Sequence, residues 1–419
     1  MDLADLERFN GWWKTGQVRT DFLPAFKREL FFEINKYIEN RQMLLLRGLR
    51  RTGKTTLFYQ MIESLLKENP HQHIFYFSFD EIAFDLKEVL ENYQKLILGK
   101  PFDQLSQRVY LFLDEIQKVP DWENKIKIYY DLYPSLKIFL SGSAAVSLQK
   151  KGKESLAGRI FDFRLEPLSF EEYLVLKGKD PATIRRNPSL WKRELVALSY
   201  QYLKYGMFPE LISLDEEVAR KYLSNNVIDR IIYKDIQEEF RITDLELLKS
   251  LISILAKNPG MMVNYKELAK NLGRDERTIS NYFEYLEFGL LIRFVFNYRG
   301  SPVASARKLK KAYFSAPNLI FALNDDLSRV LPAMLENAVC VHADAHFFYR
   351  SSYEVDFVFP HNNRISKVIE VKSNRQEIKQ LLRFRRQFGS EVQSIVITFE
   401  EEGEEEGISI IPLWKWLLQ

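Results

Sequence analysis

The sequence predicts an α/β protein whose first third forms a parallel sheet and is followed by two further folded regions. Three observations support this prediction. Residues 169–255 show helical spacing of apolar groups, whereas residues 346–411 return to short strands around one charged helix. In the first third, short apolar runs that suit buried strands alternate with helical segments: Met43–Arg47, His73–Phe79, Val109–Leu113 and Lys137–Leu140. Strands alternating with helices are typical of a parallel sheet covered by helices on both faces.

The composition is that of a folded chain without a strong charge bias. At 419 residues the chain is too long for one ordinary core, so we expect two or three domains. The net charge is only +3, so any contact with nucleic acid has to come from a local basic patch. Cys340 is the only cysteine, which excludes an internal disulfide and favours a reducing cytoplasm. No apolar stretch approaches the roughly 20 residues of a membrane helix, and the acidic first residues do not predict a signal peptide. We therefore expect a cytoplasmic protein with no membrane partner.

A glycine-rich loop lies between the first apolar strand and the helix after it. Residues 48–55, Gly-Leu-Arg-Arg-Thr-Gly-Lys-Thr, match the phosphate-binding pattern G-x-x-x-x-G-K-[ST]. Glycines let the backbone curl so that its N–H groups face phosphate oxygens at a helix N-terminus. Lys54 is expected to reach the β- and γ-phosphates, and Thr55 to offer its hydroxyl to Mg²⁺. The sequence therefore predicts ATP and Mg as cofactors, bound by Gly48, Leu49, Arg50, Arg51, Thr52, Gly53, Lys54, Thr55 and Thr56.

Two later strands end in polar side chains that suit the same site. Val109–Leu113 is followed by Asp114 and Glu115. Asp114 is expected to orient the Mg²⁺ shell, and Glu115 to polarise the attacking water. The next strand ends at Ser141-Gly-Ser, where Ser143 either senses the γ-phosphate or caps the following helix. Both interpretations of Ser143 stay open from the residues alone.

An ordered series of sequence blocks resembles a known family. The blocks are Gly-Leu-Arg-Arg-Thr-Gly-Lys-Thr-Thr, Leu-Asp-Glu-Ile-Gln, Ser-Gly-Ser, Leu-Ala-Gly-Arg-Ile-Phe-Asp-Phe-Arg-Leu-Glu-Pro-Leu-Ser-Phe-Glu-Glu-Tyr, Tyr-Gly-Met-Phe-Pro-Glu and Ile-Tyr-Lys-Asp-Ile. Together they are similar to the prokaryotic, archaeal-type AAA+ P-loop ATPases. That resemblance implies an ATPase followed by a winged helix and a restriction-endonuclease-like (PD-(D/E)xK) domain. With the helical pattern of the middle region we expect a P-loop ATPase core at 1–168, a helical lid or linker at 169–240, a winged helix at 241–315 and the restriction-endonuclease-like domain at 316–419. The resemblance also implies that Arg159 is a charge sensor or arginine finger, although the residues alone favour a surface ion pair. A finger acting between subunits would require a homo-oligomer.

Residues 262–314 predict a helix–turn–helix followed by a β-hairpin, which is the winged-helix layout. The expected helices are Tyr265–Leu272 and Glu276–Phe288. Candidate DNA contacts are Arg274, Arg277, Asn281 and the Arg299–Lys311 wing. Three glutamates weaken the basic face of the second helix, and winged helices also dock proteins. DNA and protein partners therefore both stay open.

The C-terminal region places acidic residues on neighbouring strands. The order is a helix with Glu336, a strand with Asp356, a strand with Glu370 and Lys372, and then another helix. Glu370 and Lys372 are two residues apart on a strand and share one face. Through the family resemblance these four residues form a metal-dependent nuclease site, in which Asp356 and Glu370 hold Mg²⁺ and Lys372 positions water. A surface salt-bridge ladder is the competing interpretation.

Two functions follow from these predictions. The first is an AAA+-type ATPase that couples nucleotide state to DNA binding or processing, with DNA endonuclease activity as an extension. The second is an ATP-switched signalling or scaffolding protein in which an inactive nuclease-like domain binds a partner.

Overall fold

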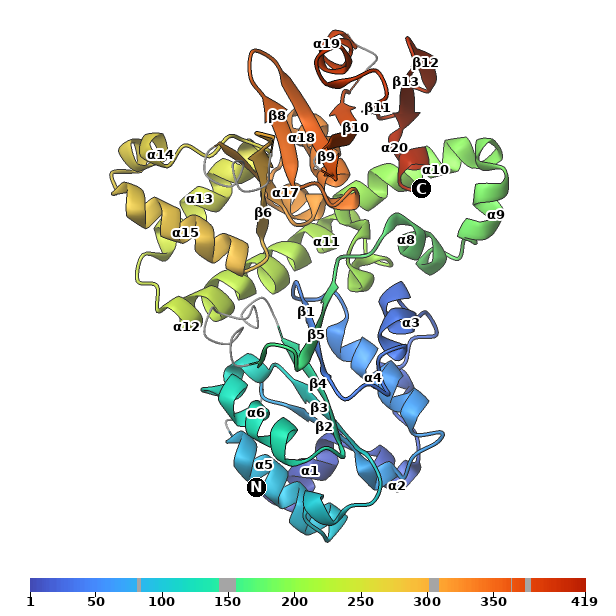
Figure 1. Ribbon diagram of the computed structural model, residues 1–419, viewed down its shortest axis with the longest axis vertical. Coiled ribbons are helices and arrows are strands. Elements are labelled where there is room, and N and C mark those ends of the chain that lie inside the picture. Colours follow the sequence, from blue (N-terminus) through green and yellow to red (C-terminus); the bar gives the residue numbers. More distant parts are fainter. Residues whose placement is uncertain (81–83, 143–155, 301–308, 363, 374–377) are drawn as a thin grey trace. The chain divides into compact units, whose positions relative to one another are not determined.

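The computed structural model describes residues 1–80, 84–142, 156–300, 309–362, 364–373 and 378–419. The chain divides into two compact units, Met1–Glu166 and Pro167–Gln419 (Figure 1).

The first unit contains a five-stranded sheet in the order β2-β3-β4-β1-β5. All four neighbouring pairs are parallel, which confirms the predicted parallel sheet. The fifth strand is not among the strands that the apolar runs predict, because it lies at an edge and is only partly buried. The strands are β1 (Met43–Gly48), β2 (Ile74–Ser78), β3 (Val109–Asp114), β4 (Leu136–Gly142) and β5 (Ile160–Leu165).

Helices cover both faces of this sheet, as Figure 1 shows. On one face α3 (Glu29–Asn35) and α4 (Lys54–Leu65) pack against Leu44 and Leu46 of β1. On the other face α5 (Leu86–Tyr93) and α6 (Trp122–Leu132) belong to the core that contains Met43 and Leu45. Alternate residues of β1 thus enter two different cores, which explains why its sequence is apolar without interruption. Two short helices, α1 (Leu3–Phe9) and α2 (Trp12–Thr15), precede them.

The second unit begins with a helical region, as the sequence predicts for residues 169–255. The α-helices before the next strand are α8 (Phe170–Leu176), α9 (Pro181–Arg186), α10 (Lys192–Gln201), α11 (Glu216–Tyr222), α12 (Gln237–Phe240), α13 (Leu245–Lys257), α14 (Tyr265–Leu272) and α15 (Glu276–Phe288). The bounds of α14 and α15 are the predicted ones. Asp275 caps α15 by accepting a hydrogen bond from the N–H of Thr278, so a tight turn separates the two helices.

An eight-stranded sheet follows, in the order β12-β13-β11-β10-β9-β8-β6-β7. Its strands are β6 (Ile292–Asn297), β7 (Lys310–Phe314), β8 (Phe347–Arg350), β9 (Glu354–His361), β10 (Arg364–Val371), β11 (Gln393–Thr398), β12 (Gly403–Glu405) and β13 (Ile408–Pro412). The accompanying helices are α17 (Pro317–Leu323), α18 (Leu327–His342), α19 (Lys379–Phe388) and α20 (Leu413–Trp416). The β6–β7 hairpin pairs with β8 through Phe296 and Asn297, so it forms one end of this sheet.

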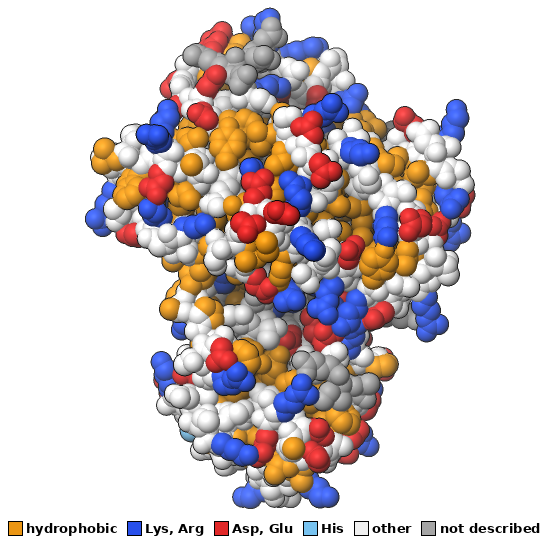
Figure 2. Space-filling view, turned by 180° about the vertical axis from the view of Figure 1, so that it is seen from behind, with side chains coloured by type: hydrophobic (Ala, Val, Ile, Leu, Met, Phe, Trp, Pro, Cys, Tyr) orange, Lys and Arg blue, Asp and Glu red, His pale blue; other side chains and the backbone are white. Residues whose placement is uncertain are grey.

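The surface carries charges of both signs. On the face that Figure 2 shows, Lys and Arg side chains are intermingled with Asp and Glu side chains. This pattern agrees with the nearly balanced composition. Within the described ranges, the structure contains no helix that is both long and apolar enough to cross a bilayer.

Candidate nucleotide site and carboxylate cluster

The glycine-rich loop connects β1 to α4 at the carboxyl edge of the parallel sheet, where ligands of such sheets bind. Gly53 precedes α4 with φ of 99°, a conformation that suits glycine. A Cβ atom on Gly48 would lie 2.4 Å from the carbonyl oxygen of Leu165, so the approach of β5 requires glycine there. The hydroxyl of Thr52 donates to the carbonyl of Leu49 at 2.8 Å. The chain's own contacts therefore shape the loop.

Lys54 and Thr55 begin α4 and make the two contacts most relevant to phosphate and metal binding. The Lys54 Nζ atom donates to the carbonyl oxygens of Gly48 at 3.0 Å and Leu49 at 3.1 Å, and its side chain is buried. The hydroxyl of Thr55 donates to Oδ2 of Asp114 at 2.8 Å. The two residues predicted to form the Mg²⁺ site are thus already in contact.

Asp114 is buried at the end of β3, and both of its oxygens accept hydrogen bonds. Oδ2 also accepts from the hydroxyl of Tyr76 at 2.9 Å. Oδ1 accepts from the hydroxyl of Ser141 and from the N–H of Glu115 at 3.1 Å. These four donors are all neutral groups. A carboxylate and a hydroxyl are oxygen donors of the kind that Mg²⁺ prefers, so this pair fits the ion.

Ser141 and Tyr76 are absent from the predicted set. The sequence favours Ser143, which lies outside the described residues. Strand register supplies the missing signal: Leu113 of β3 is level with Leu140 of β4, so Ser141 follows beside Asp114. Tyr76 lies on β2, the other neighbour of β3.

Glu115 follows Asp114 in a left-handed conformation with φ of 54°. Burial raises the pKa of the Glu115 carboxyl, while the positive charges of Lys54 and Arg50 lower it and the charge of Asp114 raises it further. The side-chain amide of Gln117 donates to the Glu115 carboxylate. A buried carboxyl with a raised pKa beside the glycine-rich loop is suited to general-base work.

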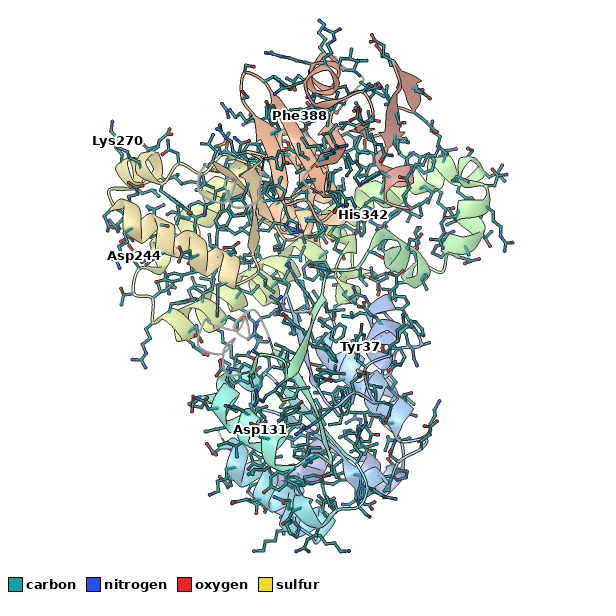
Figure 3. All side chains as sticks on the ribbon, in the orientation of Figure 1. Tyr37, Asp131, Asp244, Lys270, His342 and Phe388 are labelled. Carbon is teal, nitrogen blue, oxygen red and sulfur yellow. The ribbon has the colours of Figure 1, made fainter. Side chains whose placement is uncertain are left out.

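Arg159 lies at the opposite edge of the sheet from the glycine-rich loop. Its carbonyl accepts a hydrogen bond from the N–H of Met43, the first residue of β1. The glycine-rich loop begins at Gly48, the last residue of the same strand. β1 has six residues, which at about 3.3 Å per residue separates the two by roughly 17–20 Å. The guanidinium instead pairs with Asp131 of α6, labelled in Figure 3, at 3.0 and 3.3 Å. This geometry contradicts a charge-sensor role within one chain and agrees with the ion pair that the residues alone favour.

Arg28 is a buried residue of this site that the sequence analysis missed. Its guanidinium donates to the carbonyl of Thr52 at 3.0 Å and to the carbonyl of Glu166 at 2.9 Å. It therefore ties the glycine-rich loop to the chain just after β5. The sequence gives little signal for this contact, because the two partners are main-chain atoms that lie 24 and 138 residues away.

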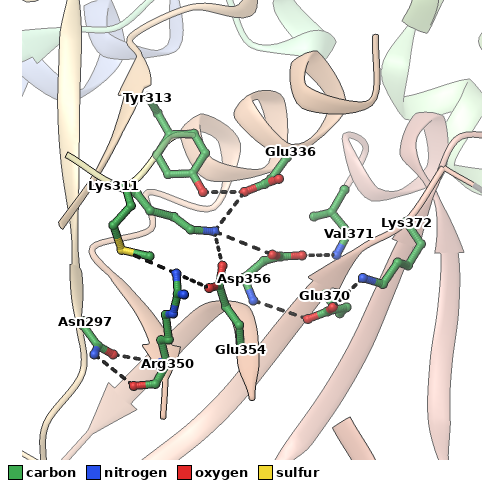
Figure 4. Close-up of polar contacts among 11 residues, drawn as sticks. Asn297, Lys311, Tyr313, Glu336, Arg350, Glu354, Asp356, Glu370, Val371 and Lys372 are labelled. Carbon is green, nitrogen blue, oxygen red and sulfur yellow. Dashed lines mark hydrogen bonds and ion pairs between the residues drawn. The ribbon is translucent and has the colours of Figure 1, made fainter. Parts of the chain in front are cut away.

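The predicted nuclease residues meet in the second unit (Figure 4). Asp356 and Glu370 lie on the antiparallel strands β9 and β10. The N–H of Val371 donates to Oδ2 of Asp356 at 2.8 Å, and the N–H of Asp356 donates to Oε2 of Glu370 at 3.3 Å. The Nζ atom of Lys372 is 2.7 Å from Oε1 of Glu370. Four acidic side chains lie together here, and we call them the carboxylate cluster: Glu336 of α18, Glu354 and Asp356 of β9, and Glu370 of β10.

Lys311 of β7 enters this cluster, contrary to its predicted place in a DNA-binding wing. Its Nζ atom is 2.7 Å from Oε1 of Glu354, 3.5 Å from Oε1 of Glu336 and 3.9 Å from Oδ1 of Asp356. The side chain is buried, because β7 belongs to the large sheet and presents it to α18 and β9. A buried ammonium bonded to carboxylates cannot contact DNA phosphates.

Burial also sets the electrostatics of the cluster. It raises the pKa of Asp356 well above its usual range, and the charges of Glu370 and Glu336 add to that effect. It raises the pKa of Glu370 too, although Lys372 opposes this. Within the described residues no group of three or more His, Cys, Asp or Glu side chains is arranged to hold a metal ion. Lys311 and Lys372 instead contact the acids for which the sequence predicts Mg²⁺.

The three predicted DNA contacts on α14, α15 and the turn between them differ in exposure and in their partners. Arg277 is exposed and Asn281 is half-buried. Arg274 is exposed as well, but its guanidinium pairs with Asp244, labelled in Figure 3, at 2.8 and 3.1 Å. Most of the predicted wing, residues 301–308, lies outside the described residues.

Comparisons with known proteins complete this description. Residues 40–174 match a family model described as AAA domain, and residues 197–328 match a domain of unknown function (DUF8612). The solved structure of AMPPCP-bound DnaA from Aquifex aeolicus is 16% identical, with a TM-score of 0.31, and the match covers 64% of this chain and 90% of that chain.

Two relatives from Methanocaldococcus jannaschii extend over most of the chain. The uncharacterized protein MJ1544 is 29% identical over 91% of this chain and 89% of its own length. The uncharacterized protein MJ1637 is 30% identical over 92% of this chain and 87% of its own length. The chain therefore belongs to the same family as MJ1637, and its residues 40–174 form an AAA domain.

Proposed function

We propose that this protein binds Mg²⁺-ATP at residues 48–56 and hydrolyses it. The observation that carries the proposal is the 2.8 Å hydrogen bond from the Thr55 hydroxyl to Asp114, beside a loop with the phosphate-binding sequence pattern. Two elements that are distant in the sequence thereby present the hydroxyl and carboxylate oxygens that suit Mg²⁺. The AAA domain at residues 40–174 covers both elements.

Each residue then has a defined role. Lys54 exchanges its carbonyl partners at Gly48 and Leu49 for phosphate oxygens, and the N–H groups at the start of α4 bind the same phosphates. Thr55 and Asp114 hold the ion, which neutralises phosphate charge when it is bound. Glu115 orients the attacking water and accepts its proton.

We further propose that the second unit binds nucleic acid in a manner that depends on the nucleotide. In support, α14 and α15 followed by the β6–β7 hairpin have the winged-helix layout, with Arg277 exposed on α15. The order α18, β9, β10, α19 agrees with a restriction-endonuclease-like domain. The alternative is a nucleotide-switched protein whose second unit binds a partner without cutting it. Lys311 within the carboxylate cluster favours binding over cleavage.

Two measurements on the full chain test these proposals. ATP hydrolysis is measured for the wild type and for Asp114→Asn, with and without single- and double-stranded DNA. DNA binding by the wild type is measured with and without nucleotide. We expect Asp114→Asn to lose hydrolysis. In the wild type we expect DNA to change the hydrolysis rate, or nucleotide to change the affinity for DNA. Hydrolysis that survives in Asp114→Asn would remove this residue from the site. DNA binding that is absent in every nucleotide state would leave the ATPase proposal intact and favour a protein partner.

A further inference from the structure

The carboxylate cluster surrounds an ammonium group that comes from another strand. Oxygens of Glu354, Glu336 and Asp356 lie 2.7, 3.5 and 3.9 Å from the Nζ atom of Lys311. Figure 4 shows these side chains converging on that nitrogen from β9 and α18. The ammonium therefore occupies the point at which three of the four acids meet.

The main chain of Lys311 is paired with a neighbouring segment on each side. Lys311 pairs with Val295 of β6 on one side and forms an isolated bridge with Met262 on the other. Tyr313, two residues along and on the same face of β7, donates its hydroxyl to Glu336. The position of Lys311 thus depends on the strand as a whole and not on a mobile side chain alone.

The remaining oxygens of the predicted metal pair are also engaged. Asp356 and Glu370 accept main-chain N–H groups, and Lys372 pairs with the second oxygen of Glu370. A hard divalent cation requires several oxygens converging at about 2.0–2.6 Å, and two lysine ammonium groups compete for these oxygens.

The cations near the cluster nearly neutralise it. Lys311 and Lys372 pair with its acids, and Arg350 lies 3.4 Å from Glu354. These three cations leave one net negative charge on the four acids when all seven groups are ionised. A divalent ion added to this set would leave an excess of positive charge in a largely buried place, which is costly.

We propose that Lys311 is the resident cation of the carboxylate cluster: its ammonium takes the place of a divalent metal ion, and the native chain binds no such ion there. The cluster then acts as an ionic tie that joins the β6–β7 hairpin to strand β9 and helix α18. This inference rests on the nuclease-like part of the proposed function for its contrast, but it is independent of ATP hydrolysis. Its tests measure metal binding and not turnover, so its failure and that of the ATPase proposal are distinguishable.

The first test uses the native lysine. Mn²⁺ uptake is measured by the electron paramagnetic resonance of free Mn²⁺, in an Asp114→Asn background that silences the nucleotide site. We expect Asp356→Asn to leave uptake unchanged, because the cluster holds no ion. A Mn²⁺ site that disappears with Asp356→Asn would overturn the proposal.

The second test removes the ammonium in the same background. We expect Lys311→Met to gain a Mn²⁺ site at least about tenfold tighter than any site of its parent, since the acids lose their counter-ion. Adding Asp356→Asn should abolish the new site. Lys310→Met is the matched control, because the Lys310 Nζ atom lies 3.6 Å from the centre of the Phe294 ring. This variant should gain no Mn²⁺ site. Mn²⁺ affinity that is the same in folded Lys311→Met and in its parent would overturn the proposal. If Lys311→Met does not fold, the first test decides alone.

Discussion

The nucleotide loop and the carboxylate cluster both hold a buried lysine, but they surround it with different partners. In the loop, Lys54 donates to two main-chain carbonyls, and Asp114 accepts hydrogen bonds from hydroxyls and an N–H. In the cluster, Lys311 is bonded directly to carboxylates. Carbonyl and hydroxyl groups are neutral partners, so a phosphate can take their place. Carboxylates cancel the charge of the ammonium, so a lysine among them is a completed ion pair.

The largest effect should come from removing the lysine that is paired with carboxylates. We expect Lys311→Met to lower the free energy of unfolding of the second unit by about 3–5 kcal/mol, because buried acids would lose their partner. Lys310→Met, at a half-buried neighbouring position, should cost less than about 1.5 kcal/mol. Urea unfolding with hydrogen exchange followed in β9 and β10 measures both. Equal costs for the two variants would show that the cluster contributes no special stability.

The next largest effect is expected at Lys54 and Asp114, which are held by neutral hydrogen-bond partners. We expect Asp114→Asn to lower ATP turnover by about 10²–10³-fold, the usual loss when one charge-stabilising group is removed. Lys54→Ala should weaken ATP binding by a similar factor. Lys14→Ala, an exposed lysine paired with Glu7 in the same unit, serves as the matched control and should change neither. Unchanged nucleotide affinity in Lys54→Ala, measured by titration, would contradict the phosphate-binding assignment.

A third buried lysine extends the comparison to a site with no predicted ligand. The Nζ atom of Lys137 on β4 donates to the carbonyls of Tyr37, Asn40 and Gln42 at 2.7–2.8 Å, just before β1 begins. We expect Lys137→Met to cost about 2–3 kcal/mol of stability in the first unit, because three carbonyls lose their donor. Hydrogen exchange in β1 and β4 measures this loss.

The same lysine gives a dependence on pH. Burial lowers the pKa of Lys137 to about 7, against roughly 10.4 in an unfolded chain. Between these values the unfolded state binds more protons, so the contribution of Lys137 to stability rises with pH. The stability difference between the wild type and Lys137→Met should therefore grow from pH 7 to pH 9. A difference that does not vary with pH would show that the three carbonyls keep the ammonium charged.

Local patterns predict much of this molecule. The four continuous apolar runs form β1 to β4, because strands buried on both faces need no polar alternation. β5 escapes prediction because Ile160-Phe-Asp-Phe-Arg-Leu is a half-exposed edge strand. The pairing of β6 with β8 escapes it as well, since it joins residues about 50 positions apart through only two residue pairs.

The candidate sites divide along the same line. Lys54, Thr55, Asp114 and Glu115 follow from short motifs whose chemistry is local. Ser141, Arg28 and Lys311 depend on strand register or on long-range contacts. Lys311 in particular lies at the end of a basic run that resembles a solvated segment, and only the placement of β7 beside α18 makes it a buried partner of Glu336 and Glu354.

The smallest effect on stability concerns an ion pair at the surface. Arg159 and Asp131 are both partly exposed, so we expect Arg159→Ala to leave the melting temperature almost unchanged. Its position far from the loop of its own chain leaves one catalytic role, contact with the nucleotide of a second copy. If the protein assembles in that way, Arg159→Ala should lower ATP turnover while Asp131→Ala, which frees the same guanidinium, does not. Turnover is measured at concentrations where light scattering shows an oligomer. Equal turnover in the wild type and both variants would show that Arg159 has no catalytic role and only forms the surface ion pair with Asp131.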